Sequence, residues 1–266
     1  MKKLMALAGA LLMAGTLCSC SKKVEKGEFT IQKGKLMVAM EIGYPPFEYY
    51  AEDGTTPLGF DVELGKALAE KLGLEVEFID TAWDGIFAGL NTNRYDAVIS
   101  ACTITSERKE NFDFSEPYIG NGQAIILHKD STLPITQMKD LENLKVGYQG
   151  ETTSDIYTKK VSAQEGWKYK ENAYDKVMNA YDDLRLKRID AVVSDNLVAV
   201  DYLTKENSPF KRVFLGEPDE YFGVTMKKNN TVLKEKIDAA LAEMKADGSL
   251  KELYIKVFGM DLTDSI

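Results

Sequence analysis

The sequence predicts an α/β protein made of two similar lobes, each with a mostly parallel sheet flanked by helices. Apolar segments of strand length alternate with amphipathic helical segments from residue 35 onward, a pattern typical of βαβ units. One helix-to-strand segment also occurs twice, as RYDAVIS at residues 94–100 and as RIDAVVS at residues 188–194. Because both copies follow a helical pattern and run into an apolar strand, we expect two lobes that each present a strand end.

Composition narrows the class of protein. The chain has 266 residues, of which 44% are hydrophobic, and a formal net charge of −9. This length suits two domains of ordinary size. The net negative charge argues against a nucleic-acid partner. No cluster of lysine and arginine interleaved with aromatic residues argues for one. A single histidine and the lack of a metal-ligand pattern predict neither a metal nor a cofactor.

The first residues have the pattern of a secretory signal. Lys2 and Lys3 precede an apolar run at residues 4–17 that is short for a membrane span. The run ends in LCSC, which resembles a bacterial lipobox and makes Cys20 the expected lipidated residue; ordinary secretion with cleavage nearby is the alternative. Residues 1–19 are therefore the expected signal peptide, and the lysine-rich residues 20–34 the expected lipidated tether.

The first lobe is expected to begin with a strand that leads into a rigid loop at Pro45 and Pro46. A helix capped by Asp61 and ended by Gly73 follows. Thr105 is the expected cap of a short helical turn after the first repeat. The predicted elements are a strand at residues 35–42, a helix at 61–72, a strand at 75–79, a helix at 84–93 and a strand at 97–99.

The second lobe is expected to begin after a glycine-rich crossing at residues 120–122 and to end at a return crossing at residues 218–221. The predicted elements between and after them are strands at residues 123–127, 145–149, 191–193 and 213–215, a helix at 175–187, and C-terminal helices at 232–244 and 250–258. We therefore predict that lobe 1 comprises residues 35–119 plus 221–266, and lobe 2 residues 120–220.

The ends of the two repeated strands carry opposite charges. The first leads into small and hydroxyl-bearing residues and then Arg108, and the second is followed directly by Asp195. In open parallel sheets, ligands bind outside the carboxyl ends of the strands. Arginine suits a carboxylate and aspartate an ammonium group. If the two strand ends face each other, a zwitterion fits between them.

Several motifs together resemble a known family. The segments are YPPFEY, GFDVELGKALAEKLG, the helix at Trp83 that leads into YDAVIS, TITSERKENFDFSEPY, and IDAVVSD. They resemble the bacterial solute-binding proteins of amino-acid ABC transporters, family 3, over about residues 35–258. The resemblance implies a two-lobe, periplasmic-binding-protein-like fold of type II, with two hinge strands between the lobes and closure around one amino acid.

The resemblance also implies which residues hold the amino-acid head group. Arg108 matches the arginine that grips the ligand carboxylate with two prongs, and Thr103 the hydroxyl beside the carboxylate and amino groups. Ala101 matches the position whose backbone contacts the amino group. Asp195 matches the acid that pairs with the ammonium group. Without a ligand role, Arg108 would be a solvated side chain and Asp195 a helix cap.

A glycine-to-hydroxyl turn supplies the expected anion loop of lobe 2. Thr153 matches the residue whose backbone N–H binds the ligand carboxylate, at a turn that opens a helix. Glu151 is an extra residue compared with the usual Gly-Thr-Thr, so Thr152 is the alternative to Thr153.

Three further residues are expected to surround the ligand side chain. Tyr44 and Trp83 match aromatic walls, although aromatic residues are more often part of a core. Glu41 matches a position that reads the far end of the side chain, although a polar residue at a strand end needs no special role. Aromatic walls and an acid predict a polar or cationic ligand of the arginine, lysine, histidine or glutamine type.

The resemblance implies a monomeric, lipid-anchored binding component of an ABC importer rather than an enzyme. Its expected partners are a free amino acid, a membrane permease and the membrane itself through the N-terminal lipid. Its expected location is the cell envelope, facing the periplasm or the extracellular side. Two other functions on the same fold stay open: a dehydratase-like enzyme that uses Glu41 or Asp195 as acid or base, and a sensor that reports to another partner.

Overall fold

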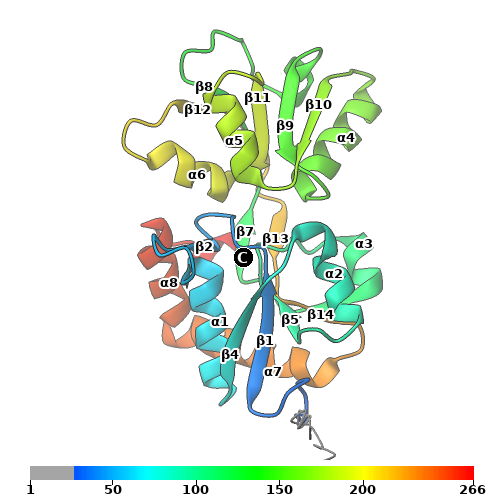
Figure 1. Ribbon diagram of the computed structural model, residues 1–266, viewed down its shortest axis with the longest axis vertical. Coiled ribbons are helices and arrows are strands. Elements are labelled where there is room, and N and C mark those ends of the chain that lie inside the picture. The colour runs from blue at the N-terminus through cyan, green and yellow to red at the C-terminus, as the bar shows by residue number, and fades with distance from the viewer. Residues whose placement is uncertain (1–26) are drawn as a thin grey trace, which may run out of the picture.

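The computed structural model describes residues 27–266, which form two lobes (Figure 1). The expected signal peptide and Cys20 lie outside the described residues. Within residues 27–266, no helix combines the length and the apolar character needed to cross a membrane.

The sheet of lobe 1 has five strands in the order β4-β1-β5-β14-β6. β1 pairs in parallel with β4 and β5, whereas β14 pairs antiparallel with β5 and β6. The strand bounds are β1 Lys35–Met40, β4 Glu75–Asp80, β5 Ala97–Val98, β6 Phe112–Phe114 and β14 Thr225–Lys227. The lobe is therefore α/β as predicted, but its sheet is only half parallel, because β14 returns from lobe 2 against the direction of the first strands.

The sheet of lobe 2 repeats this plan in the order β10-β9-β11-β8-β12. β9 pairs in parallel with β10 and β11, and β8 pairs antiparallel with β11 and β12. The strand bounds are β8 Gln123–His128, β9 Lys145–Gln149, β10 Lys170–Tyr174, β11 Ala191–Asp195 and β12 Phe210–Leu215. The prediction of mostly parallel sheets is thus corrected in both lobes.

Helices flank both sheets, and the C-terminal pair returns to lobe 1 beside α1 (Figure 1). The helices of lobe 1 are α1 Phe60–Lys71, α2 Trp83–Asn91, α3 Ser106–Asn111, α7 Thr231–Asp247 and α8 Ser249–Phe258. Those of lobe 2 are α4 Thr153–Glu165, α5 Val177–Arg185 and α6 Asn196–Thr204. Short 3-10 turns occur at Met138–Leu141 and Thr263–Ser265, and β2 Tyr49–Tyr50 pairs with β3 Pro57–Leu58 in a small hairpin.

Two short strands join the lobes. β7 (Ile119–Asn121) and β13 (Glu220–Phe222) pair antiparallel and lie between the two sheets (Figure 1). A Cβ atom on Gly120 would lie 2.1 Å from the carbonyl oxygen of Ser265, so only glycine fits where the C-terminal segment approaches this pair. The two strands are at the crossings that the sequence suggested.

The aspartate of each repeat has the same structural role. Asp96 accepts a hydrogen bond from the backbone N–H of Met37 at 2.8 Å, and Asp190 accepts one from that of Lys145 at 2.8 Å. In each lobe the aspartate thereby ties the strand of the repeat to the start of its parallel neighbour. The repeated sequence reflects this shared strand pairing, while the residues after each copy differ.

The segment before β1 is part of lobe 1. Ile31 donates its backbone N–H to Asp96 at 2.6 Å, and Thr30 is buried. Phe29 packs against the core, with the ammonium of Lys236 4.8 Å from its ring. Residues 29–31, which we expected in a tether at residues 20–34, are therefore fixed on the lobe.

Asp61 does not cap α1, in contrast to the sequence prediction. The cap position is Gly59, and the first N–H groups of the helix, those of Phe60 and Asp61, donate to the carbonyls of Pro46 and Phe47, each at 2.9 Å. Backbone carbonyls thus satisfy the donors that a capping side chain would serve. The carboxyl group of Asp61 is free to point into the lobe, where it is fully buried.

Candidate functional site

A cavity of about 290 Å³ lies where the strand ends of the two lobes meet. Eleven residues line it: Glu41, Tyr44, Trp83, Ser100, Ala101, Thr103, Arg108, Gln149, Thr152, Thr153 and Asp195. The structure thus brings together all the residues that the sequence analysis selected for ligand binding. Sequence reasoning gave no role to Ser100 or Gln149. The signal for Gln149 was its position, since it ends β9 as Glu41 follows the end of β1.

Arg108 enters the cavity from the first turn of α3. Thr105 caps this helix and accepts a hydrogen bond from the backbone N–H of Arg108, as predicted. The guanidinium group lies 5.3 Å from the ring centre of Trp83 and 5.1 Å from that of Phe87, and Nη1 donates to the carbonyl of Thr103 at 2.9 Å. None of the ion pairs in residues 27–266 involves Arg108. The cation is held in place by aromatic faces and keeps donors for an anion.

Asp195 lies at the end of β11 and is buried. Its carboxylate accepts hydrogen bonds from Tyr44 Oη at 2.5 Å, Asn121 Nδ2 at 2.8 Å and Gln123 Nε2 at 2.9 Å. Burial raises the pKa of Asp195, while these three hydrogen bonds and Arg108 oppose the rise. Although Asp195 occupies the cap position of α6, its side chain makes no capping bond. The carboxylate is therefore directed to the cavity rather than to the helix.

The turn between β9 and α4 distinguishes the two candidate threonines. Thr152 is the cap of α4, accepting from the backbone N–H of Asp155 and donating to the carbonyl of Gln149 at 2.7 Å. Thr153 begins the helix, and its hydroxyl lies 3.3 Å from that of Thr103 in lobe 1. The Thr152 hydroxyl is thus occupied by the turn, whereas Thr153 is the first residue of α4 and contacts lobe 1 across the cavity.

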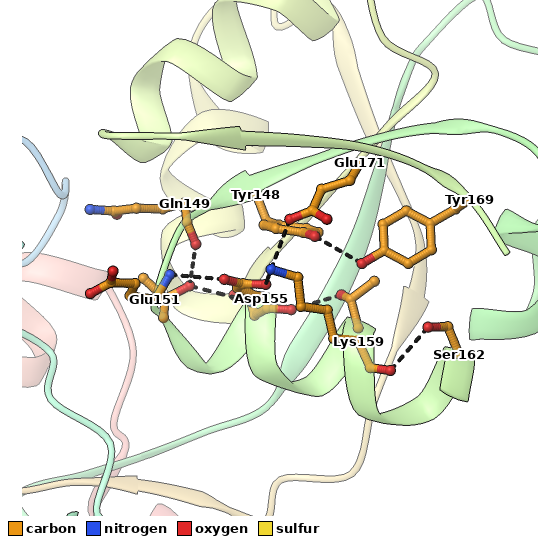
Figure 2. Close-up of polar contacts among 11 residues, drawn as sticks. Tyr148, Gln149, Glu151, Asp155, Lys159, Ser162, Tyr169 and Glu171 are labelled. Carbon is orange, nitrogen blue, oxygen red and sulfur yellow. Dashed lines mark hydrogen bonds and ion pairs between the residues drawn. The ribbon is translucent and has the colours of Figure 1, made fainter. Parts of the chain in front are cut away.

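A network on lobe 2 fixes this turn (Figure 2). Glu151, whose φ angle is 61°, donates its backbone N–H to Asp155 at 2.9 Å. Lys159 pairs with Asp155 and with Glu171 of β10, both at 2.8 Å. The extra residue in the loop is accommodated by this left-handed conformation and by the side chain of Asp155. The N-terminus of α4 is held toward lobe 1, where free backbone N–H groups suit an anion.

Besides the hydrogen bond between the hydroxyls of Thr103 and Thr153, four cross-lobe hydrogen bonds show that the lobes are closed. Tyr44 Oη donates to Asp195, and Trp83 Nε1 donates to the carbonyl of Glu151 at 3.1 Å. The other two run from Gln149 Nε2 to the carboxyl group of Glu41 and from Lys176 Nζ to the carbonyl of Ile42. Tyr44 and Trp83 therefore line the cavity with their rings while their polar ends join the lobes.

Glu41 and Gln149 line the part of the cavity that we call its far end, whereas Asp195 contacts Asn121 of the hinge strand β7. Gln149 Nε2 donates to Glu41 Oε2 at 2.9 Å and to the carbonyl of Asp175 at 3.0 Å. Among the described residues, neither Glu41 Oε1 nor Gln149 Oε1 has a hydrogen-bond partner, although both are buried. Burial raises the pKa of Glu41 to about 7, while Gln149 and Lys176 oppose the rise. Two buried acceptors without donors are unusual in a folded protein and suit a ligand that donates.

A buried acid pair lies beneath the loop that carries Ser100 and Ala101. Ser100 Oγ donates to Glu48 Oε1 at 2.6 Å and accepts from the backbone N–H of Glu41 at 3.0 Å. Asp61 Oδ2 accepts from the backbone N–H of Ala101 at 2.6 Å and from Tyr118 Oη at 3.0 Å. Burial raises the pKa of Asp61 to about 7 and that of Glu48 as well, the latter further through the charge of Asp61. The pair sets the position of the cavity wall.

This pair predicts a pH-dependent stability. An acid whose pKa is raised on folding stabilises the fold fully below its unfolded pKa of about 4, and this contribution is lost as the pH rises through its folded value. For Asp61 the window extends to about 7. The unaltered protein should lose unfolding free energy between about pH 5 and about pH 8. Asp61→Asn should lose on the order of 2 kcal/mol less over the same range, as measured by urea denaturation.

The matched control is Glu63→Gln on the same helix. Hydrogen bonds from Lys256 and Lys66 lower the pKa of Glu63, so Glu63 is ionised in both the folded and the unfolded state above about pH 5. Glu63→Gln should therefore lower stability by a similar amount at about pH 5 and at about pH 8 and leave the pH dependence in this window unchanged. An unchanged pH profile of Asp61→Asn would contradict the assignment of a protonated acid at this position.

Residues 27–266 offer neither a metal site nor a reactive thiol. No group of three or more histidine, cysteine, aspartate or glutamate side chains is arranged to hold a metal ion. Cys102 is a buried free cysteine, and burial raises the pKa of its thiol. A raised pKa disfavours the reactive thiolate, so Cys102 acts as a small apolar residue.

The chain is also similar to known proteins over most of its length. The model of the bacterial extracellular solute-binding proteins, family 3, matches residues 36–260. The chain is 36% identical to an L-cystine-binding protein of Escherichia coli (strain K12) over 232 residues, 87% of this chain and 85% of that one. It superposes with a TM-score of 0.79 on an ancestral arginine-binding protein bound to arginine, with 41% identity, 85% of this chain and 99% of that one covered.

A second structure of an ancestral arginine-binding protein, bound to glutamine, is similar to the same degree. Its TM-score is 0.79 and its identity 42%, with 86% of this chain and all of that one covered. The family match extends over nearly all of the described residues, and the similarity includes both lobes. The chain therefore belongs to the bacterial extracellular solute-binding proteins, family 3.

Proposed function

We propose that this protein binds one free amino acid with a polar or cationic side chain, of the arginine, lysine, histidine or glutamine type, and delivers it to an ABC permease. The observation that carries this proposal is the pairing of Arg108 and Asp195 in one closed cavity. The guanidinium group would take the ligand carboxylate and the aspartate its ammonium group. The relatives named above support an amino acid as cargo, since their names specify cystine, arginine and glutamine.

The surroundings of the pair suit a zwitterion held away from water. Asp195 is buried and Arg108 is stacked on aromatic rings, so their hydrogen bonds to a ligand form in a medium of low dielectric. A micromolar dissociation constant corresponds to about 8 kcal/mol. Four or five charge-assisted hydrogen bonds, each contributing about 1.5–3 kcal/mol, reach this value after association costs.

The far end of the cavity supports the choice of side chain. The unpartnered acceptors Glu41 Oε1 and Gln149 Oε1 require a donor, which ammonium, guanidinium, imidazole or amide groups supply and aliphatic groups do not. Tyr44 and Trp83 would hold the stem between them. Closure of the lobes around the ligand is the signal that a permease would read.

The cellular context is part of the proposal. We propose that the mature protein begins at Cys20, carries lipid there, and works as a monomer on the outer side of a membrane. The mass of the mature N-terminus would check the lipid. The dehydratase and sensor alternatives share the fold, but no arrangement in residues 27–266 favours them over a binding role.

Titration calorimetry with a panel of amino acids tests the proposal. We expect micromolar binding of at least one of arginine, lysine, histidine and glutamine, and no heat from leucine or alanine, because an aliphatic side chain leaves Glu41 and Gln149 unpaired. Heat released by aliphatic amino acids alone would contradict the proposed side-chain class. A turnover assay with a prephenate-like acid should give no product; steady product formation would instead support the enzymatic alternative.

A further inference from the structure

A second pair of opposite charges lies beside the cavity at Glu41, and its lysine, Lys176, is just outside the residues that line the cavity. Lys176, from the segment of lobe 2 that precedes α5, places Nζ 3.9 Å from Glu41 Oε1 and donates to the carbonyl of Ile42 at 2.9 Å. Its stem crosses Gly43, where a Cβ atom would lie 3.1 Å from Nζ. The side chain of Glu41 is 4% exposed and that of Lys176 is 38% exposed. The lysine is therefore positioned at the outer edge of the Glu41 pocket and not in open solvent.

This pair resembles the head-group pair in its charges. Arg108 and Asp195 bring one positive and one negative charge to the near end, which together match a zwitterion. Lys176 and Glu41 bring the same combination to the far end. Of the three protons on Lys176 Nζ, one is used by Ile42, while Glu41 Oε1 and Gln149 Oε1 have no donor among the described residues. The far end thus offers both donors and acceptors.

We infer that the preferred ligand ends in a second amino-acid head group, so that the far pair binds a second zwitterion. This inference rests on the proposed function and specifies its substrate class: a diaminodicarboxylic acid with one head at Arg108 and Asp195. Glu41, with Gln149 beside it, takes the distal ammonium group. Lys176 takes the distal carboxylate, which makes it a specificity-determining residue.

Charge balance separates this ligand from the simpler candidates. A purely cationic side chain has to share Glu41 with Lys176, which leaves one positive charge in excess and places like charges side by side. An amide side chain offers a donor and an acceptor but no charge, so the ion pair gains no charge-assisted hydrogen bond from it. A second zwitterion satisfies both charges and the two unpartnered oxygens at once.

Calorimetry with four probes tests this on the full-length mature protein: L-cystine, L-cystathionine, L-arginine and L-glutamine. The first two share the double head group and differ in whether a disulfide joins the halves. We expect both to bind about ten-fold or more tightly than arginine or glutamine. Lys176→Met, which keeps the stem over Gly43, should weaken both by about ten-fold or more and leave arginine equal or tighter.

The control variants distinguish recognition of the ligand's charge by Lys176 from a role of Lys176 in holding the lobes closed. Lys205→Met removes a lysine that pairs with Asp201 on α6 and should change no affinity. Glu41→Gln should weaken the double-headed ligands and arginine together, because both use its charge. If Lys176→Met weakens all four probes equally, the lysine only joins the lobes and the inference is overturned.

The remaining outcomes distinguish the inference from the function on which it rests. Preference of the unaltered protein for arginine or glutamine over both double-headed probes overturns the inference and leaves the proposed function in place. Binding of cystine but not cystathionine shows recognition of the disulfide rather than of a second head group and also overturns it. Failure of every amino acid to bind overturns the proposed function itself.

Discussion

Arg108→Ala is expected to weaken the binding of every amino acid at least about 100-fold. Removing one partner of a buried charge pair costs about 2–5 kcal/mol, and the ligand carboxylate would be left in a closed cavity without its cationic partner. The loss should be the same for all side chains, because every amino acid has this carboxylate. Titration calorimetry of the ligand that binds best, followed by the rest of the panel, measures it.

The geometry at Arg108 also predicts the effect of a conservative change. The flat guanidinium group lies against Trp83 and Phe87 while donating to Thr103. Lysine has neither the flat face nor the fork of donors, so Arg108→Lys should recover only a small part of the affinity. The matched control is Lys109→Ala, which removes an exposed charge from the next position of α3. Unchanged affinity in Arg108→Ala, with normal thermal stability, would contradict the role of this arginine.

The sequence predicted best those cavity residues that lie close in the chain to a recognisable strand end or helix start. Asp195 is the last residue of β11 and Arg108 lies in α3, the helix that follows β5, and a strand end has a fixed place in an α/β lobe. The turn from Gly150 to the hydroxyl-bearing residues at the start of α4 is also a local signal. For these residues the pattern in the chain was sufficient to select the cavity wall.

Contacts between segments that are distant in sequence could not be read in the same way. Lys176 meets Glu41 only because the closed lobes bring the segment before α5 to the end of β1, and no local pattern marks that lysine. Asp61 has the sequence pattern of a helix cap, but the carbonyls of Pro46 and Phe47 satisfy the helix instead. The direction of β14 and β8 depends on the hinge crossings. The prediction of parallel strands was therefore wrong for half of each sheet.

Asp195→Asn is expected to lower affinity for all amino acids by about 100-fold while stabilising the ligand-free protein. The amide has the shape of the carboxylate and can keep most of the hydrogen bonds with Tyr44, Asn121 and Gln123. It lacks the negative charge that a ligand ammonium group requires, and losing such a buried partner costs about 2–5 kcal/mol. Calorimetry measures the loss of affinity.

The gain in stability should depend on pH in a definite direction. Burial raises the pKa of Asp195, so the native protein holds this proton more tightly than the unfolded chain. The unaltered protein therefore loses the corresponding stability as the pH rises above the unfolded value of about 4, whereas the amide has no proton to lose. Urea midpoints at about pH 5 and about pH 8 should show that Asp195→Asn is more stable than the unaltered protein, and the difference should be larger at the higher pH.

Asp182→Asn, at an exposed ion pair with Arg185, provides the control and should show no such gain in stability. A variant at Asp195 that is less stable at high pH and still binds amino acids would mean that the carboxylate supports the fold, and that the ligand ammonium group is held elsewhere.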